Sequence, residues 1–169
     1  IVCNAYWELM RIAFYLGDYR EAVRWKDRLA DYIDRYHASL YDLRDCALCW
    51  FLLRVGDTAP VADWIAPGGP HKADQPLDVG RDRLTVAACA MVKGSLSLAN
   101  VVMTGLESAL REKGLWLERL ILFVMKASRL LPEGKRREAT QWFHKAYSMA
   151  VHNDITTIFA EFGSGMQKL

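Results

Sequence analysis

The chain has 169 residues, 52% of them hydrophobic, and a mean hydropathy of -0.02. No apolar run approaches the roughly 18 residues that a membrane-spanning helix needs, so we expect no membrane segment. Lysine and arginine (22) nearly balance aspartate and glutamate (20), and a net charge of +2 gives no basic surface for nucleic acid phosphates. The four cysteines lie in apolar stretches, as reduced packing cysteines do, which favours a cytoplasmic protein over a secreted disulfide-linked one.

Glycine recurs along the chain at steps of 39, 38 and 40 residues: Gly17, Gly56, Gly94 and Gly134. A small residue follows each of them five positions later: Ala22, Val61, Ala99 and Ala139. Glycine can end a helix in the left-handed conformation without a Cβ clash, and a small residue lets the next helix approach closely. The pattern therefore predicts four helical hairpins, each turning at one of these glycines.

In chain order we expect helices over 2–16, 19–36, 40–55, 59–66, 81–93, 96–113, 115–131 and 136–152, with a short helix over 154–162. Asp18, Thr58 and Ser95 are placed to cap second helices of the hairpins. One hairpin cannot bury its own apolar face, so stability has to come from stacking on its neighbours. The fold class predicted is all-α, a right-handed superhelical stack of antiparallel helix pairs with about four repeats of 38–40 residues.

We expect a single helical-repeat domain over 1–169. Its repeats cover about 2–37, 40–66, 81–113 and 115–152, and the short helix over 154–162 closes it. The exception to tight connections is 67–79, where three prolines and two glycines predict a long, exposed and mobile loop.

The segment from Leu16 to Leu29 resembles a tetratricopeptide motif, with Gly17, Tyr19 and Ala22 in the expected relation. A narrower resemblance runs from 43 to 99 through Gly56-Asp57, Ala62-Asp63-Trp64-Ile65 and Arg81–Ala87, and it ends in the tail Ile158–Met166. This series is similar to the repeat region of large MalT-like, LuxR-type transcriptional regulators.

The resemblance implies a signal-receiving superhelix that controls an ATP-dependent switch. ATP would bind a missing upstream domain, and DNA would be contacted only through a missing C-terminal helix-turn-helix domain. The sequence begins at Ile1 with neither a start methionine nor the pattern of a signal sequence, so we expect it to be a piece of a longer protein. The chain departs from the family pattern at Phe162, which interrupts the acidic-Gly pair of the tail.

No motif in the sequence predicts catalysis or a cofactor. Cys46 and Cys49 have C-x-x-C spacing but lie within an apolar helix with no second ligand pair, so core packing is the main interpretation. The four histidines form no H-x-x-x-H pair, and no phosphate loop or nucleophile elbow occurs. We therefore expect a protein that is not an enzyme and holds no metal.

A binding groove is the one site that the pattern favours. In such a stack the first helix of each pair lines the concave surface, which selects Asn4, Trp7, Arg11, Tyr15, Trp50, Arg54, Arg81 and Met91. Tryptophan, tyrosine and arginine are enriched at binding hot spots. The alternative is that Trp7 and Trp50 belong to the core, since tryptophan is highly buried on average.

Two functions follow from these observations. The first is a sensor region of a LuxR-type regulator that binds a small effector or a regulatory protein in the groove. The second is a free-standing tetratricopeptide-like adaptor that binds peptides of partner proteins. Self-association through exposed repeat ends is a further expectation.

Overall fold

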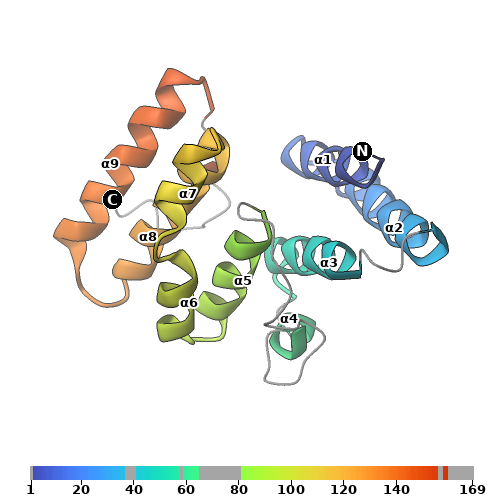
Figure 1. Cartoon of the computed structure of the whole chain (residues 1–169), viewed down its shortest axis with the longest axis horizontal. Coiled ribbons are helices and arrows are strands. Elements are labelled where there is room, and N and C mark those ends of the chain that lie inside the picture. The colour runs from blue at the N-terminus through green and yellow to red at the C-terminus, as the bar shows by residue number, and fades with distance from the viewer. Residues whose placement is uncertain (1, 37–40, 58, 65–80, 156–157, 160–169) are drawn as a thin grey trace. The chain divides into compact units, whose positions relative to one another are not determined.

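The computed structural model describes residues 2–36, 41–57, 59–64, 81–155 and 158–159. Over these ranges the chain forms helices and turns without a β-strand, which confirms the all-α prediction (Figure 1). The helices are α1 (Val2–Tyr15), α2 (Tyr19–Tyr36), α3 (Tyr41–Val55), α4 (Ala59–Trp64), α5 (Arg81–Val92), α6 (Leu96–Met103), α7 (Leu106–Glu112), α8 (Trp116–Leu130) and α9 (Arg136–His152).

The chain divides into two compact units, which we describe separately. Unit 1 covers Ile1–Asp74 and contains α1 to α4; unit 2 covers Gln75–Leu169 and contains α5 to α9. The single domain over 1–169 and the continuous stack of four repeats stay predictions. The loop predicted over 67–79 lies outside the described residues, as do parts of the short helix predicted over 154–162.

The helices pair about the four predicted glycines. α1 packs against α2, α3 against α4, α5 against α6 and α8 against α9. The glycine of each turn has a positive φ, between +73° and +82°, at Gly17, Gly56, Gly94 and Gly134. The small residue five positions later has no exposed surface in any of the four hairpins, at Ala22, Val61, Ala99 and Ala139. Both parts of the hairpin prediction are confirmed.

One predicted helix is wrong in its extent. The segment 96–113 forms two helices, because α6 ends at Met103 and α7 begins at Leu106. Between them Thr104 is extended (φ -68°, ψ 131°) and Gly105 is left-handed (φ 74°). The Thr104 hydroxyl donates to the Asn100 carbonyl, 2.7 Å away, which satisfies a carbonyl freed by the helix end.

Unit 2 turns at a shorter interval than the predicted repeat. At each of four turns an N–H donates to the carbonyl five residues earlier, over 2.8 to 3.1 Å: Ser95 to Ala90, Leu115 to Leu110, Lys135 to Leu130, and Ile155 to Ala150. This is the bond that closes a helix in a Schellman motif. Each of these turns follows the previous one by 20 residues. Unit 2 therefore turns twice within each predicted repeat of 38–40 residues.

The predicted helix caps have different outcomes. Asp18 caps α2, since its Oδ1 accepts the Glu21 N–H over 3.0 Å. Ser95 precedes α6 but makes no side-chain cap bond, because its backbone (φ -80°, ψ 62°) is not the extended conformation of a capping residue. Thr58 lies outside the described residues.

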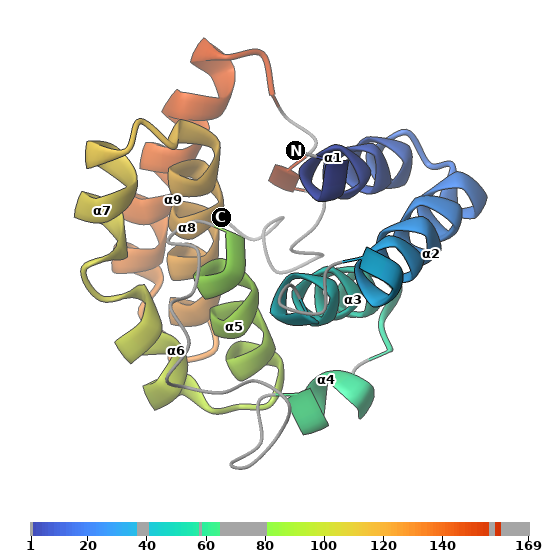
Figure 2. The same cartoon turned by 45° about the vertical axis from the view of Figure 1, so that its right-hand side comes forward.

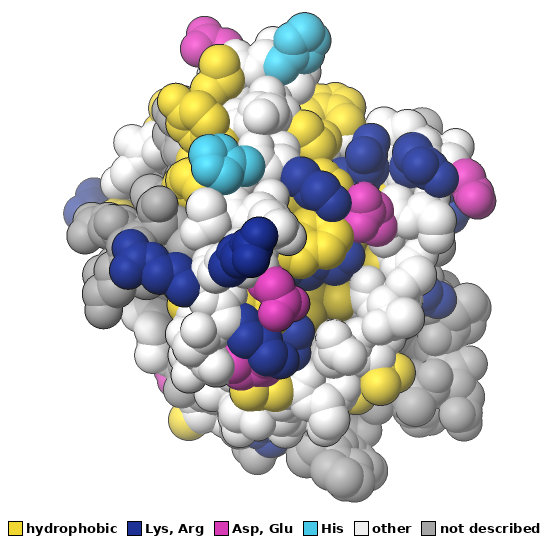
Figure 3. Space-filling view, turned by 90° about the vertical axis from the view of Figure 1, so that its left-hand side faces the viewer, with side chains coloured by type: hydrophobic (Ala, Val, Ile, Leu, Met, Phe, Trp, Pro, Cys, Tyr) yellow, Lys and Arg dark blue, Asp and Glu magenta, His cyan; other side chains and the backbone are white. Residues whose placement is uncertain are grey.

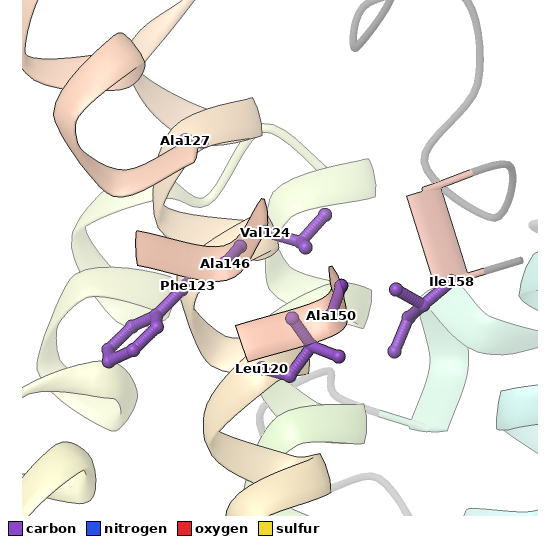
Figure 4. Close-up of a cluster of buried hydrophobic side chains, with 7 residues drawn as sticks. All are labelled: Leu120, Phe123, Val124, Ala127, Ala146, Ala150 and Ile158. Atoms are coloured by element: carbon purple, nitrogen blue, oxygen red, sulfur yellow. The ribbon is translucent and has the colours of Figure 1, made fainter. Parts of the chain in front are cut away.

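The main core of unit 2 lies between α8 and α9 (Figure 4). Large residues of α8 meet two alanines of α9, Ala146 and Ala150, which are fully buried. Small residues on α9 let the two helix axes approach, and Ile158 closes one end of the cluster. The α8 members are Leu120, Phe123, Val124 and Ala127. Both helices of this hairpin also contribute residues to the cleft described below.

Candidate ligand-binding cleft

The predicted groove residues are divided between the two units of the chain. Asn4, Trp7, Arg11, Tyr15, Trp50 and Arg54 belong to unit 1, whereas Arg81 and Met91 belong to α5 of unit 2. The side chain of Arg81 is outside the described ones. Trp7 is 2% exposed and Trp50 is 5% exposed, so both tryptophans are interior residues of unit 1. The structure thus favours the core alternative for these two residues.

Trp50 is the centre of an aromatic cluster between α1 and α3. Its ring lies 6.0 Å from Trp7, 5.6 Å from Phe14 and 6.2 Å from Tyr15, measured between ring centres. The guanidinium of Arg54 covers the Trp50 ring at 3.9 Å and donates to the Trp50 carbonyl over 3.1 Å. Trp7, Tyr15, Trp50 and Arg54 are therefore brought together, but as packing that ties α1 to α3.

The other two predicted groove residues of α1 differ in exposure. Arg11 is buried and forms an ion pair with Glu8, one turn earlier on the same helix, over 3.1 Å. Asn4 is exposed.

An open cleft is present in unit 2, between α6 and α7 on one side and α9 on the other, with α8 at its base. Its volume is about 490 Å³. Figure 3 shows this face of the molecule, with hydrophobic side chains in a hollow flanked by basic and acidic ones. The lining residues are Asn100, Met103, Thr104, Gly105, Glu107, Ser108, Arg111, Lys126, Arg129, Leu130, Glu138 and Trp142.

The break between α6 and α7 shapes one wall of the cleft. Thr104 and Gly105 both line it, and the extended and left-handed conformations there divide the segment into two short helices beside α8 (Figure 2). The hydroxyl of Ser108 donates to the Gly105 carbonyl over 2.9 Å. The wall is therefore formed by the feature of unit 2 that the sequence pattern did not predict.

Trp142 of α9 forms the opposite wall with one lysine near it from each helix of the hairpin. The Lys126 ammonium lies 4.1 Å and the Lys145 ammonium 4.0 Å from the centre of its ring, which are cation–π distances. The Phe123 ring lies 5.4 Å away, at 36° to the indole. Contacts with these three side chains hold the half-buried indole in place.

Two cations of the cleft already have carboxylate partners. Lys126 pairs with Glu107 over 3.3 Å, across α8 and α7. Arg129 pairs with Glu133 over 3.0 Å, and Glu133 also pairs with Lys135 over 2.9 Å. The hydrogen bond from Lys135 lowers the pKa of the Glu133 carboxyl below its ordinary value, and the charges of Arg129 and Lys135 act in the same direction.

Two further charges of the cleft are exposed and stand apart from these pairs. Arg111 on α7 and Glu138 on α9 both line the cleft. Neither forms an ion pair with any residue that the structure describes. One positive and one negative group thus remain available to a ligand, from opposite walls.

Cys46 and Cys49 are buried in α3 as free thiols, as the packing interpretation predicted. The acidic row of α2 lies at the surface, where Asp31 pairs with Arg35 over 3.7 Å. Over the described ranges, no three His, Cys, Asp or Glu side chains are grouped so that they could hold a metal ion. Among the described helices, none is both long and apolar enough to cross a membrane.

Sequence reasoning missed the cleft, although two signals for it were present. Of the predicted groove residues with described side chains, none lines it. The first signal was Thr104-Gly105 in the middle of the predicted helix 96–113, a pair that can interrupt a helix. A tryptophan on a helix rich in charged residues, Trp142, was a second sign of a surface site.

The chain is built of helical hairpins over the described residues, and unit 2 carries a cleft of about 490 Å³. Comparison with known proteins finds no matching family model, no matching curated protein and no matching solved structure. The likeness to LuxR-type regulators therefore rests on the sequence motifs alone.

Proposed function

We propose that this chain is a non-catalytic binding module and that the cleft of unit 2 is its ligand site. The observation that carries the proposal is the composition of the cleft. The half-buried ring of Trp142 gives it an apolar surface, and charged and amide side chains line other parts of it. Its volume of about 490 Å³ is within the range of roughly 300–1,000 Å³ that small-molecule sites occupy.

The polar groups of the cleft support binding rather than a reaction. The hydroxyls of Thr104 and Ser108 each donate to a backbone carbonyl of their own helix turn. A nucleophilic hydroxyl must direct its proton to an adjacent base, whereas both of these hydroxyls direct it to a backbone carbonyl. Lys126 is paired and stacked on Trp142, which suits a positioning role.

The wider role that we propose is signal sensing within a LuxR-type transcriptional regulator. The resemblance of 43–99 and of the tail to that family supports it, together with the confirmed hairpins. In this proposal the hairpins continue as a right-handed stack, and a small effector or a regulatory protein bound at the cleft controls the switch in a missing ATP-binding domain.

An adaptor is the second candidate, and a feature of α1 favours it. One face of this helix, continued by the first residue of the turn after it, exposes apolar residues at alternating steps of three and four: Val2, Ala5, Leu9, Ile12 and Leu16. Ile12 is 52% exposed and Leu16 is 79% exposed. Apolar residues at this spacing form the seam along which two amphipathic helices pack. The partner would therefore present an amphipathic helix to this face of α1.

The test is a thermal-shift screen of the chain against metabolites, amino acids and short peptides. A ligand that binds the folded state raises the melting temperature in proportion to its occupancy. Each hit is repeated on Ser108→Trp, which places a large side chain in the cleft, and on Ser148→Trp, an exposed α9 position outside it.

A saturable rise that Ser108→Trp abolishes and Ser148→Trp preserves supports the proposal. Hits that survive Ser108→Trp place binding elsewhere and overturn it. A screen without hits also counts against a small-molecule sensor. Binding of an amphipathic helical peptide that Ile12→Lys abolishes would support the adaptor instead.

A further inference from the structure

We infer that the ligand of the unit 2 cleft is a zwitterion with an apolar middle, a short peptide with a free amino end and a free carboxyl end. The inference rests on the proposed function and names the chemical class of its ligand. Three observations carry it: two available opposite charges, the neutralisation of the other charges, and the apolar surface of the cleft.

The first observation is the position of the two available charges. Arg111 belongs to α7 and Glu138 to α9, so they lie on opposite walls of one cleft. A guanidinium recognises a carboxylate through two parallel hydrogen bonds, and a carboxylate accepts hydrogen bonds from an ammonium group. A peptide lying across the cleft can satisfy both groups at once with its two termini.

The second observation is the charge balance of the remaining groups. Lys126 is neutralised by Glu107 and Arg129 by Glu133. A ligand with one net charge would engage Arg111 or Glu138 alone, so it would gain one charged hydrogen-bonding contact where a zwitterion gains two. Phosphates and polycations are therefore disfavoured, and a ligand with both charges is matched.

The third observation is the apolar surface of the cleft. Trp142 lines it with a half-buried indole, whereas Met103 and Leu130 line it but are almost fully buried. The indole therefore favours aliphatic side chains in the middle of the ligand, because burying apolar area stabilises a complex. The amide of Asn100 also lines the cleft and can bond to a peptide group.

The experiment measures binding of trileucine to the whole chain by calorimetry, beside N-acetyl-trileucine and trileucine amide. Each blocked form lacks one of the two terminal charges and keeps the apolar middle. We expect each to bind about tenfold more weakly than trileucine, since each loses one charged hydrogen-bonding contact.

Two isosteric variants assign each terminus to its partner. Glu138→Gln should weaken binding of trileucine and of its amide about tenfold and leave the N-acetyl form unchanged. Arg111→Gln should weaken trileucine and the N-acetyl form and leave the amide unchanged. Arg137→Gln and Glu112→Gln are matched controls, because both residues are exposed on the same helices and lie outside the cleft lining.

Equal affinity for all three peptides overturns the inference, and so does tighter binding of either blocked form. Binding that neither variant affects overturns it as well. If trileucine does not bind, the zwitterionic ligand is wrong, whereas the proposed function still stands provided that another ligand binds and Ser108→Trp abolishes its binding. The two proposals can therefore fail separately.

Discussion

The ammonium nitrogen of Lys126 on α8 lies 4.1 Å from the centre of the Trp142 ring on α9. The same ammonium pairs with Glu107 on α7 over 3.3 Å. One side chain that lines the cleft thus connects three helices. This arrangement links the stability of the α8–α9 hairpin to the shape of the proposed binding site.

The cation–π contact predicts coupling between Lys126 and Trp142. In a double-mutant cycle of Lys126→Met and Trp142→Leu, we expect a coupling free energy of about 0.5–1 kcal/mol in favour of the native pair. Urea unfolding of the four proteins measures it. The cycle is repeated in a Glu107→Gln background so that the ion pair does not contribute, and strictly additive effects would contradict the contact.

The small residue after each glycine turn predicts a strong effect of charge. Ala139→Glu and Ala22→Glu should each destabilise their hairpin by several kcal/mol, because a carboxylate would be buried without a partner in a fully enclosed position. Ala5→Glu, at an exposed position of α1, is the matched control and should leave the melting temperature almost unchanged. Wild-type melting of Ala139→Glu by circular dichroism would refute the packing of α9.

The hairpins could be predicted because a left-handed turn residue is a local requirement. At Gly17 and Gly94 the residue type alone indicates a left-handed turn, and no information on tertiary contacts is needed. The break at Gly105 could not be predicted in the same way, because a glycine within a helix costs only about 1 kcal/mol and packing decides whether the helix continues. The regular spacing of Gly94, Gly114 and Gly134 is present in the sequence, but it is half of the 38–40-residue repeat that predicts the hairpins.

The site was harder to predict than the fold. Trp7 and Trp50 have the spacing of groove residues and of core residues alike, and only tertiary contacts distinguish the two. Trp142 is on a helix rich in charged residues, and its two lysine neighbours come from different helices. The cleft depends on the break in the α6–α7 segment, so a prediction that missed the break could not find the cleft.

The turn at Gly114 gives a prediction that separates its backbone from its surroundings. Its φ is +69°, and nothing lies within 4 Å of the position that a Cβ would take. Gly114→Ala should therefore destabilise unit 2 by about 1–2 kcal/mol through conformation alone, and Gly114→Asn by less, since asparagine tolerates this region. Chemical denaturation gives both values. A stabilising Gly114→Ala would mean that the turn is not left-handed.

The exposed face of α1 predicts that polar substitutions there are tolerated. Ile12→Lys should change the free energy of unfolding by no more than about 0.5 kcal/mol, as surface substitutions usually do. Met10→Ala, on the buried face two residues away, should cost about 2–5 kcal/mol. The two variants are compared by urea unfolding, and a large loss for Ile12→Lys would show that the face is covered within the chain.

Glu133 predicts a pH dependence with a definite sign. Its carboxyl has a folded pKa below the ordinary value of 4.5, first through the hydrogen bond from Lys135 and then through the charge of Arg129. A depressed pKa stabilises the folded state above the unfolded pKa, and that contribution is lost as the pH falls through the folded pKa. Wild type should therefore melt above Glu133→Gln at pH 6, and the difference should shrink below pH 4.5 and vanish in stronger acid. Thermal melts of the two proteins across this range measure the difference, with Glu112→Gln, an exposed carboxylate of α7, as the control. A difference that persists unchanged in strong acid would show that the side chain contributes through packing and that its charge has no part.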